Sequence, residues 1–273
     1  MSGHLVCVGT GMMLGAHLSP IAKSHIEQAD LVFSLMSTGI TERWLDEMHR
    51  DVRSLQYCYQ EGKNRNTTYN EMVEVILTEV RAGKKVTAAF YGHPGVFACV
   101  AHRAIKQATV ESLAAHMEPG ISAEDCLYAD LAIDPGKSGC MNLETSQFMF
   151  YQRNIDPAAY LILWQVGLAG DKSLEKFSTG KAYRQVLVDL LLETYPSNHQ
   201  VILYQAKVLP IDTVRAEYIT LADLVESKLF MHTTLVIPPG KKMQKNQKIL
   251  DKLAAIDRQE SQTKHRPNLR LVL

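Results

Sequence analysis

The chain has 273 residues, of which 46% are hydrophobic, so it can bury one large core or two modest ones and is not intrinsically disordered. Its 29 lysines and arginines balance 29 aspartates and glutamates, which argues against a nucleic acid or an anionic membrane as a partner, because no net charge attracts either. Five widely spaced cysteines without a C-x-x-C pair, and the lack of a signal-like apolar start, argue against disulfides, zinc and secretion and predict a soluble cytoplasmic protein.

Strands and helices alternate over residues 1–118. Strands are expected at 5–8, 30–35, 52–57 and 85–91, and helices at 19–29, at 41–49 and from 68 onward. Thr68 with Glu71 three residues later has the spacing of a capping box, and Gly83 marks the end of that helix. The alternation predicts an N-terminal α/β domain whose mostly parallel sheet is covered by helices on both faces.

The pattern changes over residues 119–256. Helices are expected at 123–133 and 183–195, and strands at 147–152, 160–164, 201–204 and 233–237. These elements predict a C-terminal α/β domain with a mixed sheet. Residues 257–273 are polar and basic without periodicity, and we expect them to form a mobile tail.

Two turns rich in glycine and proline point to a ligand site. One is Tyr91-Gly92-His93-Pro94-Gly95-Val96-Phe97, and the other is Glu118-Pro119-Gly120-Ile121-Ser122-Ala123. Glycine lets the backbone approach a ligand closely, and a helix that begins after such a turn presents unpaired N–H groups. Two such turns at the carboxyl ends of strands predict a cleft for a small cofactor.

Other candidate groups have ordinary alternatives. Gly9-Thr10-Gly11 resembles the start of a dinucleotide motif, but Leu14 replaces the third glycine, which favours a plain tight turn. His93 is a base, a metal ligand or a turn residue, and no second ligand lies at metal spacing from it, so no metal is expected. A cation such as Arg65 is unfavourable near a helix N-terminus, so either another group holds it or it is exposed beside a half-packed Tyr69.

Taken together, these segments resemble the tetrapyrrole methylase superfamily, whose members bind S-adenosylmethionine between two α/β domains. The resemblance covers about residues 5–239 and rests on Gly9-Thr10-Gly11, on Tyr91 to Gly95 where relatives have a Gly-Asp-Pro turn, and on Pro119 to Ala123. A closer likeness is to borosin peptide backbone α-N-methyltransferases, especially the split type with its precursor in trans. It rests on Tyr59, Lys63-Asn64-Arg65, Tyr69, Tyr91 to Phe97, Leu163-Trp164-Gln165 and Thr234 to Pro239. Because His93 replaces the aspartate of that turn, a tetrapyrrole is less expected as the substrate.

The resemblance implies N-methylation of backbone amides in a separate precursor peptide, with S-adenosyl-L-methionine as donor and S-adenosyl-L-homocysteine as product. It assigns catalysis to Tyr59, Arg65, Tyr69 and Tyr91. It assigns cofactor binding to Tyr91, His93, Val96, Ser122, Ala123, Gln165, Thr233 and Thr234. It also implies a homodimer, or a heterotetramer with two precursors. A small-molecule methyltransferase acting on a tetrapyrrole, and a silent peptide-binding scaffold, remain the alternatives.

The implied chemistry explains why an arginine would stand among phenols. An amide nitrogen is a poor nucleophile because its lone pair is delocalised into the carbonyl, so the site must stabilise an imidate-like state. Arg65 can hold the developing oxyanion in a water-poor pocket and lower the pKa of a nearby tyrosine, while a phenolate or a water molecule accepts the proton. Which tyrosine would be the base stays open.

Overall fold

The computed structural model describes residues 3–264 and divides the chain into two compact units. The large unit ends at Gly240, and the small unit starts at Lys241. Two sheets build the large unit, and they use separate stretches of chain, one before residue 119 and one after it. The domain boundaries expected at 118 and 256 stay a prediction, while the division by contacts falls after residue 240.

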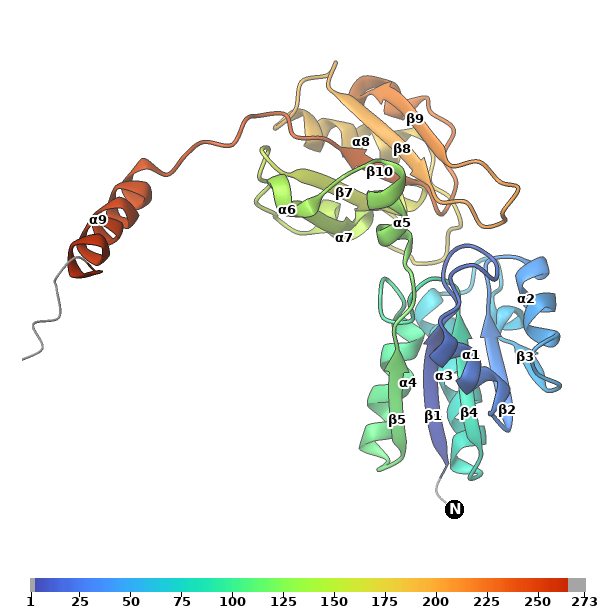
Figure 1. The fold of residues 1–273 in the computed structure, drawn as a ribbon. Helices are drawn as coiled ribbons and strands as arrows, with labels where there is room; N and C mark the ends of the chain where they lie inside the picture. Colours follow the sequence, from blue (N-terminus) through green and yellow to red (C-terminus); the bar gives the residue numbers. More distant parts are fainter. Residues whose placement is uncertain (1–2, 265–273) are drawn as a thin grey trace, which may run out of the picture. The chain divides into compact units, whose positions relative to one another are not determined.

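The first sheet is fully parallel (Figure 1). Its strands are β1 (His4–Gly9), β2 (Leu31–Leu35), β3 (Val52–Ser54), β4 (Lys85–Phe90) and β5 (Ala114–Glu118), in the order β3-β2-β4-β1-β5. Strand β1 pairs with β4 from His4 opposite Lys85 to Gly9 opposite Phe90. This register brings the carboxyl ends of the central strands to one edge of the sheet, where ligands of such folds bind.

Helices cover both faces of the first sheet, as the sequence predicts. They are α1 (Pro20–Glu27), α2 (Gly39–Asp46), α3 (Arg65–Arg81) and α4 (Cys99–Val110). Side chains alternate along β1, so Val6 and Val8 pack in the core formed with α1 and α2, whereas Leu5 and Cys7 pack in the core formed with α3 and α4. Both faces of the first sheet are therefore buried.

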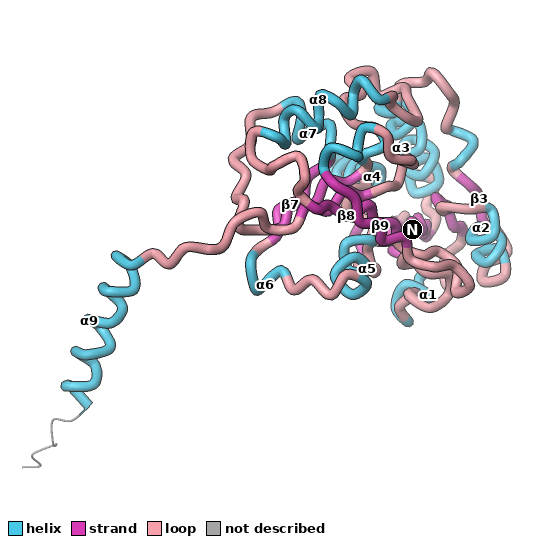
Figure 2. The backbone as a smooth tube through the Cα atoms, turned by 90° about the horizontal axis from the view of Figure 1, so that it is seen from above, coloured by secondary structure: helices cyan, strands magenta, loops and turns pink. Residues whose placement is uncertain are grey.

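The second sheet is mixed, which also agrees with the prediction. Its strands are β6 (Cys140–Glu144), β7 (Tyr160–Trp164), β8 (Gln200–Gln205), β9 (Arg215–Thr220) and β10 (Thr234–Ile237), in the order β6-β7-β10-β8-β9. Only β6 and β7 pair in parallel among these neighbours. Helices α7 (Thr145–Phe150) and α8 (Lys181–Leu192) contribute to one core, and α5 (Ala123–Asp130) contributes to the other. Figure 2 shows α7 and α8 on one side of the strands and α5 on the other, and α6 (Pro135–Ser138) precedes β6.

Three local predictions are wrong. The strand expected at 52–57 ends at Ser54, and the 3-10 helix η1 (Gln56–Cys58) follows it. The strand expected at 147–152 is helix α7, because the Glu144 carboxylate caps it by accepting a hydrogen bond from the Gln147 N–H at 2.7 Å. The capping box expected at Thr68 is absent, because α3 begins three residues earlier, with Asn64 as its N-cap. The Asn64 side chain accepts from the Asn66 N–H at 2.9 Å, and Thr68 is buried inside the helix.

The small unit contains helix α9 (Gln247–Lys264). The predicted boundary at residue 256 therefore falls inside a helix, and residues 257–264 continue it. Exposed apolar side chains recur along α9 at Ile249, Leu250, Leu253 and Ile256. The mobility expected for 257–273 stays a prediction, and residues 265–273 lie outside the described part of the chain. No helix in residues 3–264 is long and apolar enough to cross a membrane.

Candidate functional site

Three glycine turns meet where β1, β4 and β5 end. A Cβ atom on Gly9 would lie 2.5 Å from the Gly92 oxygen and 2.8 Å from the Gly120 Cα, so a side chain does not fit at this contact. Gly11 and Gly92 exchange backbone hydrogen bonds, with the Gly11 N–H donating at 3.1 Å and the Gly92 N–H at 2.9 Å. The two turns that the sequence singles out therefore lie together, beside Gly9-Thr10-Gly11.

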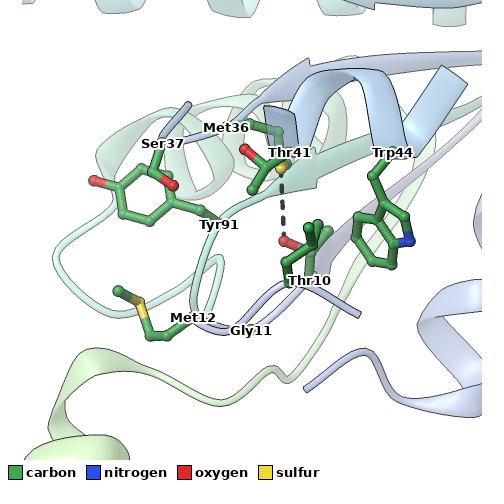
Figure 3. A pocket seen from close by; sticks show the side chains of 9 residues that line it. Thr10, Gly11, Met12, Met36, Ser37, Thr41, Trp44 and Tyr91 are labelled. Carbon is green, nitrogen blue, oxygen red and sulfur yellow. Dashed lines mark hydrogen bonds between the residues drawn. The ribbon is translucent and has the colours of Figure 1, made fainter. Parts of the chain in front are cut away.

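A small pocket opens beside these turns (Figure 3). It is lined by Thr10, Gly11, Met12, Leu14, Met36, Ser37, Thr41, Trp44 and Tyr91. The Thr10 hydroxyl donates to the Phe90 oxygen at 3.1 Å and lies 3.6 Å from the Met36 sulfur. The Tyr91 side chain is 48% exposed and forms part of the wall. Thioethers, hydroxyls and aromatic rings give this pocket a mostly apolar lining with a few polar groups.

The predicted catalytic tyrosines form a cluster. The rings of Tyr59 and Tyr69 meet edge to face, with centroids 6.3 Å apart. Burial raises the pKa of both phenols, and the nearby Tyr91 phenol raises both further. The Arg65 charge lowers the pKa of Tyr69, but burial outweighs it. The expected lowering of a tyrosine pKa by Arg65 is therefore present but too weak to give a phenolate.

Arg65 is anchored to the loop that follows β7. Its Nη1 donates to the Lys176 oxygen at 2.6 Å, and its Nη2 donates to Oδ2 of Asp171 at 3.2 Å. The Arg65 backbone N–H also donates to the Leu174 oxygen at 2.9 Å. The side chain is only 15% exposed, so the alternative of an exposed arginine is wrong. The guanidinium has five N–H donors, so these two side-chain bonds leave donors for a ligand.

Asp171 is the group that holds Arg65, and sequence reasoning missed it. The carboxylate is 1% exposed and accepts from the Ser173 N–H at 3.0 Å, the Ser173 hydroxyl at 2.6 Å and the Lys176 N–H at 3.2 Å. Burial pushes its pKa up, but these hydrogen bonds and the Arg65 charge outweigh burial and hold the pKa below its usual range. The position of Arg65 at a helix start indicates that it needs an acidic partner. The sequence does not identify Asp171 as that partner, because 106 residues separate the two.

His93 lies in the first turn as a turn residue. Its Nδ1 accepts from the Gly95 N–H at 2.9 Å, and its backbone oxygen accepts from the Val96 N–H at 3.3 Å. Because Nδ1 is the acceptor, Nε2 carries the proton of the neutral ring and is available as a donor. Of the three interpretations that the sequence left open, the geometry favours the turn residue.

Ser122 and Ala123 begin helix α5. Ser122 is 5% exposed and forms a capping box with Asp125, to which its hydroxyl donates at 2.7 Å while the Asp125 N–H donates back at 3.2 Å. Ala123 packs against the core under α5. The Ser122 hydroxyl is therefore occupied within the protein, and its contribution to a ligand site is the fixed backbone of the turn.

Gln165 follows β7 in a left-handed conformation, with φ 58°, and Phe97 at the end of the first turn has φ 50°. Such positions cost about 1–3 kcal/mol in residues other than glycine and concentrate at functional sites. The centroids of the Phe97 and Trp164 rings are 5.5 Å apart, and this contact connects the first turn to the end of β7. The turn at 91–97 therefore contacts the residue that precedes Gln165.

Thr233 and Thr234 are buried at the start of β10. The Thr233 hydroxyl oxygen accepts from the Gln205 amide at 2.6 Å and from the Phe230 N–H at 2.8 Å, and its carbonyl oxygen accepts from the Val166 N–H at 3.0 Å. Thr233 therefore locks β10 to the segment that begins with Gln165. Gln165, Thr233 and Thr234 therefore lie at the same edge of the second sheet, where β7 ends and the antiparallel strand β10 begins.

The sequence profile described as "Tetrapyrrole (Corrin/Porphyrin) Methylases" matches residues 4–206. The chain belongs to this family. Uroporphyrin-III-C-methyltransferase from Thermus thermophilus has the same fold, with a TM-score of 0.61, 17% identity and coverage of 88% of this chain and 93% of that one. Cobalt precorrin-4 methyltransferase gives a TM-score of 0.62 at 12% identity, over 86% of this chain and 94% of that one. The predicted tetrapyrrole-methylase-like fold is confirmed.

Curated relatives place the chain near borosin proteins. A "methyltransferase/ribosomally synthesized type I borosin cyclic peptide precursor" of Coprinopsis marcescibilis is 36% identical over 271 residues, which is 96% of this chain and 69% of the relative. The gymnopeptides precursor protein of Gymnopus fusipes is 39% identical, over 87% of this chain and 58% of that protein. The omphalotin A precursor protein of Omphalotus olearius is 37% identical, over 92% and 61%. The chain spans about three fifths of these last two, and all three names join methyltransferase and precursor.

Proposed function

We propose that this chain is an S-adenosylmethionine-dependent methyltransferase that N-methylates backbone amides of a ribosomal precursor peptide supplied as a separate chain. The observation that carries the proposal is Arg65, which buried Asp171 holds and whose charge acts on the Tyr69 phenol, while Tyr69 in turn clusters with Tyr59 and Tyr91. An anchored cation with several phenol donors suits an amide oxygen that gains negative charge. The borosin relatives, whose names join a methyltransferase to a peptide precursor, support the peptide as substrate.

The residues around the glycine turns fit the cofactor. We assign its binding to Tyr91, His93, Val96, Ser122, Ala123, Gln165, Thr233 and Thr234. The contact of Gly9, Gly92 and Gly120 leaves a side-chain-free floor, and His93 offers its Nε2. Ser122 and Thr233 use their hydroxyls within the protein, so they would shape the site through their backbone. When bound, the cofactor supplies an electrophilic methyl group.

The protein's own residues would act on the substrate amide. Arg65 would donate to the amide oxygen and stabilise the charge that develops as the N–H proton leaves, and Asp171 would fix the direction of the guanidinium. Tyr59 and Tyr69 have raised pKa values, so their phenols stay protonated at neutral pH and would serve as further donors. This favours water over a resting phenolate as the proton acceptor.

Mass spectrometry tests this function. Tag-free protein is incubated with methyl-deuterated S-adenosylmethionine and a synthetic leader-core peptide encoded beside the gene. We expect additions of whole labelled methyl groups to the peptide, mapped by fragmentation to backbone nitrogens. Labels on side chains alone, or on uroporphyrinogen III alone in a parallel reaction, would refute the proposal. Label on the enzyme chain instead of the peptide would refute the separate precursor. Calorimetric titration with the cofactor, with an expected thermal stabilisation on the order of a few kcal/mol at saturation, tests binding separately.

The proposal includes a cytoplasmic homodimer that binds one precursor per subunit. The exposed apolar residues Ile249, Leu250, Leu253 and Ile256 of α9 support an association, because water disfavours such a face on an isolated helix. Light scattering during size-exclusion chromatography measures the mass directly. A monomer at micromolar concentration, with and without peptide, would contradict this part of the proposal.

A further inference from the structure

Three side chains of the kinds that bind metals converge on one face of the first sheet. They are His25 from α1, and His116 and Glu118 from β5. Nε2 of His116 lies 3.3 Å from Oε1 of Glu118, and Nε2 of His25 lies 3.7 Å from the same oxygen. All three ligand atoms lie within 4.8 Å of one another. In a tetrahedral zinc site with bonds of about 2.1 Å, neighbouring ligand atoms are about 3.4 Å apart, so this spacing suits one ion.

The backbone fixes this convergence. His116 and Glu118 are two residues apart on β5 and therefore point to the same face of the sheet. Their register partners on β1 are Val6 and Val8, which pack in the core beneath α1, so this is the face that α1 covers. His25 lies in the last turn of α1, and its carbonyl oxygen accepts a hydrogen bond from the Thr87 hydroxyl on β4 at 2.9 Å.

His4 on β1 supports the ring of His116. Nε2 of His4 lies 3.2 Å from Nδ1 of His116, and the two rings are stacked with centroids 5.2 Å apart. Nε2 of His4 is placed to accept the Nδ1–H of His116, and in this tautomer Nε2 of His116 presents its lone pair on the side of Glu118 and His25.

Ordinary ion pairing does not explain the arrangement as well as a metal does. Two imidazoles direct their Nε2 atoms at one oxygen of Glu118, and protonating both would place two positive charges side by side. The side chains of His25, His116 and Glu118 are 30%, 43% and 19% exposed, so an ion can enter and solvent can complete its coordination. Imidazole with carboxylate is a ligand set that suits zinc and its neighbours.

We propose that His25, His116 and Glu118 bind one divalent transition metal ion, zinc before others, with a water molecule as the fourth ligand. The ion would clip α1 to the edge strand β5. Glu118 immediately precedes Pro119 and Gly120, so the clip would also fix the strand end from which the second glycine turn begins. The site does not depend on the proposed methyl transfer, and its test uses no activity measurement.

Zinc titration of chelator-treated, tag-free protein tests the site. Calorimetry at pH 7.5 should show one zinc ion per chain, and zinc should raise the melting temperature. Glu118→Gln keeps the shape of the side chain and should weaken binding at least about tenfold. The double variant H25Q/H116Q should lose this binding, while H102Q, which changes an exposed histidine outside the cluster, should bind as the original protein does. Affinity should fall in acid, because protons compete with the metal ion for its ligands.

Cobalt(II) identifies the ligands by absorption. Its visible bands should indicate a four-coordinate site without the strong near-ultraviolet band of thiolate ligands. A thiolate band would overturn the proposal in favour of cysteine ligands. So would the lack of zinc binding to the original protein, or undiminished binding to folded H25Q/H116Q. Circular dichroism of each variant shows that it is folded, and E118Q provides a second test with little risk to folding.

Discussion

Replacing Asp171 by asparagine should lower the rate of methyl transfer by about tenfold to a hundredfold, or about 1.4–2.7 kcal/mol of transition-state stabilisation. Asparagine has the shape of aspartate, but it removes the charge that fixes Nη2 of Arg65 at 3.2 Å and can turn an NH₂ group toward the guanidinium. Arg65 would then lose its direction without leaving the site. Cofactor affinity should barely change, because Asp171 holds the arginine and does not line the proposed cofactor site.

The same substitution should cost about 1–3 kcal/mol of unfolding free energy, because Asp171 is 1% exposed and accepts bonds from Ser173 and Lys176. The pKa of Asp171 is depressed in the folded state, so its charge stabilises the fold fully above the unfolded pKa of about 3.9. That contribution is lost as the pH falls through the folded pKa. The stability gap between the original protein and Asp171→Asn should therefore be constant near neutrality and close only below about pH 4.

Urea denaturation and single-turnover methyl transfer on the same samples separate the two effects. Asp156→Asn is the matched control, because the Asp156 carboxylate also accepts a backbone N–H two residues later, at 2.9 Å from Ala158, but belongs to neither the assigned catalytic nor the assigned cofactor-binding residues. It should leave the rate intact. An Asp171→Asn enzyme that is less stable but fully active per folded molecule would refute the positioning role and leave Asp171 a purely structural residue.

Further predictions concern the phenols and the glycine contact. Tyr69→Phe and Tyr91→Phe keep ring packing but remove a hydroxyl, so each variant should have a lower single-turnover rate and retain its fold. The loss of transition-state stabilisation in the double variant should be smaller than the sum of the two single losses, and additive losses would contradict a common role. Gly120→Ala places a methyl group against the Gly92 oxygen and the Gly9 Cα, and urea denaturation should show a loss of about 1–3 kcal/mol or more. Gly39→Ala, in helix α2 with open space around it, should be neutral or stabilising by up to about 1 kcal/mol, and an equal loss in both would contradict the steric argument.

The sequence predicts the parallel first sheet because continuous apolar runs and glycine turns are local signals. Local signals fail where a short apolar run fits either state, as in Thr145–Phe150, where capping by Glu144 decides for a helix. Local signals also misplace the start of α3. Asn64 competes with Thr68 as the N-cap, and the Asn64 side chain is held in place by donating a hydrogen bond to the Ser173 oxygen. Tertiary contacts make that choice.

Parts of the site are visible in the sequence for the same reason. Glycine and proline mark the turns at 91–97 and 118–123 in the sequence, and the two turns are in contact in the structure. The partner of Arg65 could not be found from the sequence, because Asp171 lies in the loop between η2 (Val166–Leu168) and α8, 106 residues away. His25 likewise meets His116 only because α1 packs on the sheet. The expectation of no metal rested on the spacing of residues along the sequence, which does not reveal this cluster.

The most direct test of the central claim is where labelled methyl groups appear in the peptide under single-turnover conditions, with the original enzyme and with Arg65→Lys. The account predicts label on backbone nitrogens with the original enzyme. It predicts a loss of roughly two to three orders of magnitude with Arg65→Lys, because lysine cannot form the forked bonds to Asp171, the Lys176 oxygen and the substrate. Cofactor affinity should change little in comparison, and the rates are compared per folded molecule because Arg65 also pairs with buried Asp171. A stable Arg65→Lys or Arg65→Ala enzyme that labels backbone nitrogens at the original rate would contradict the account.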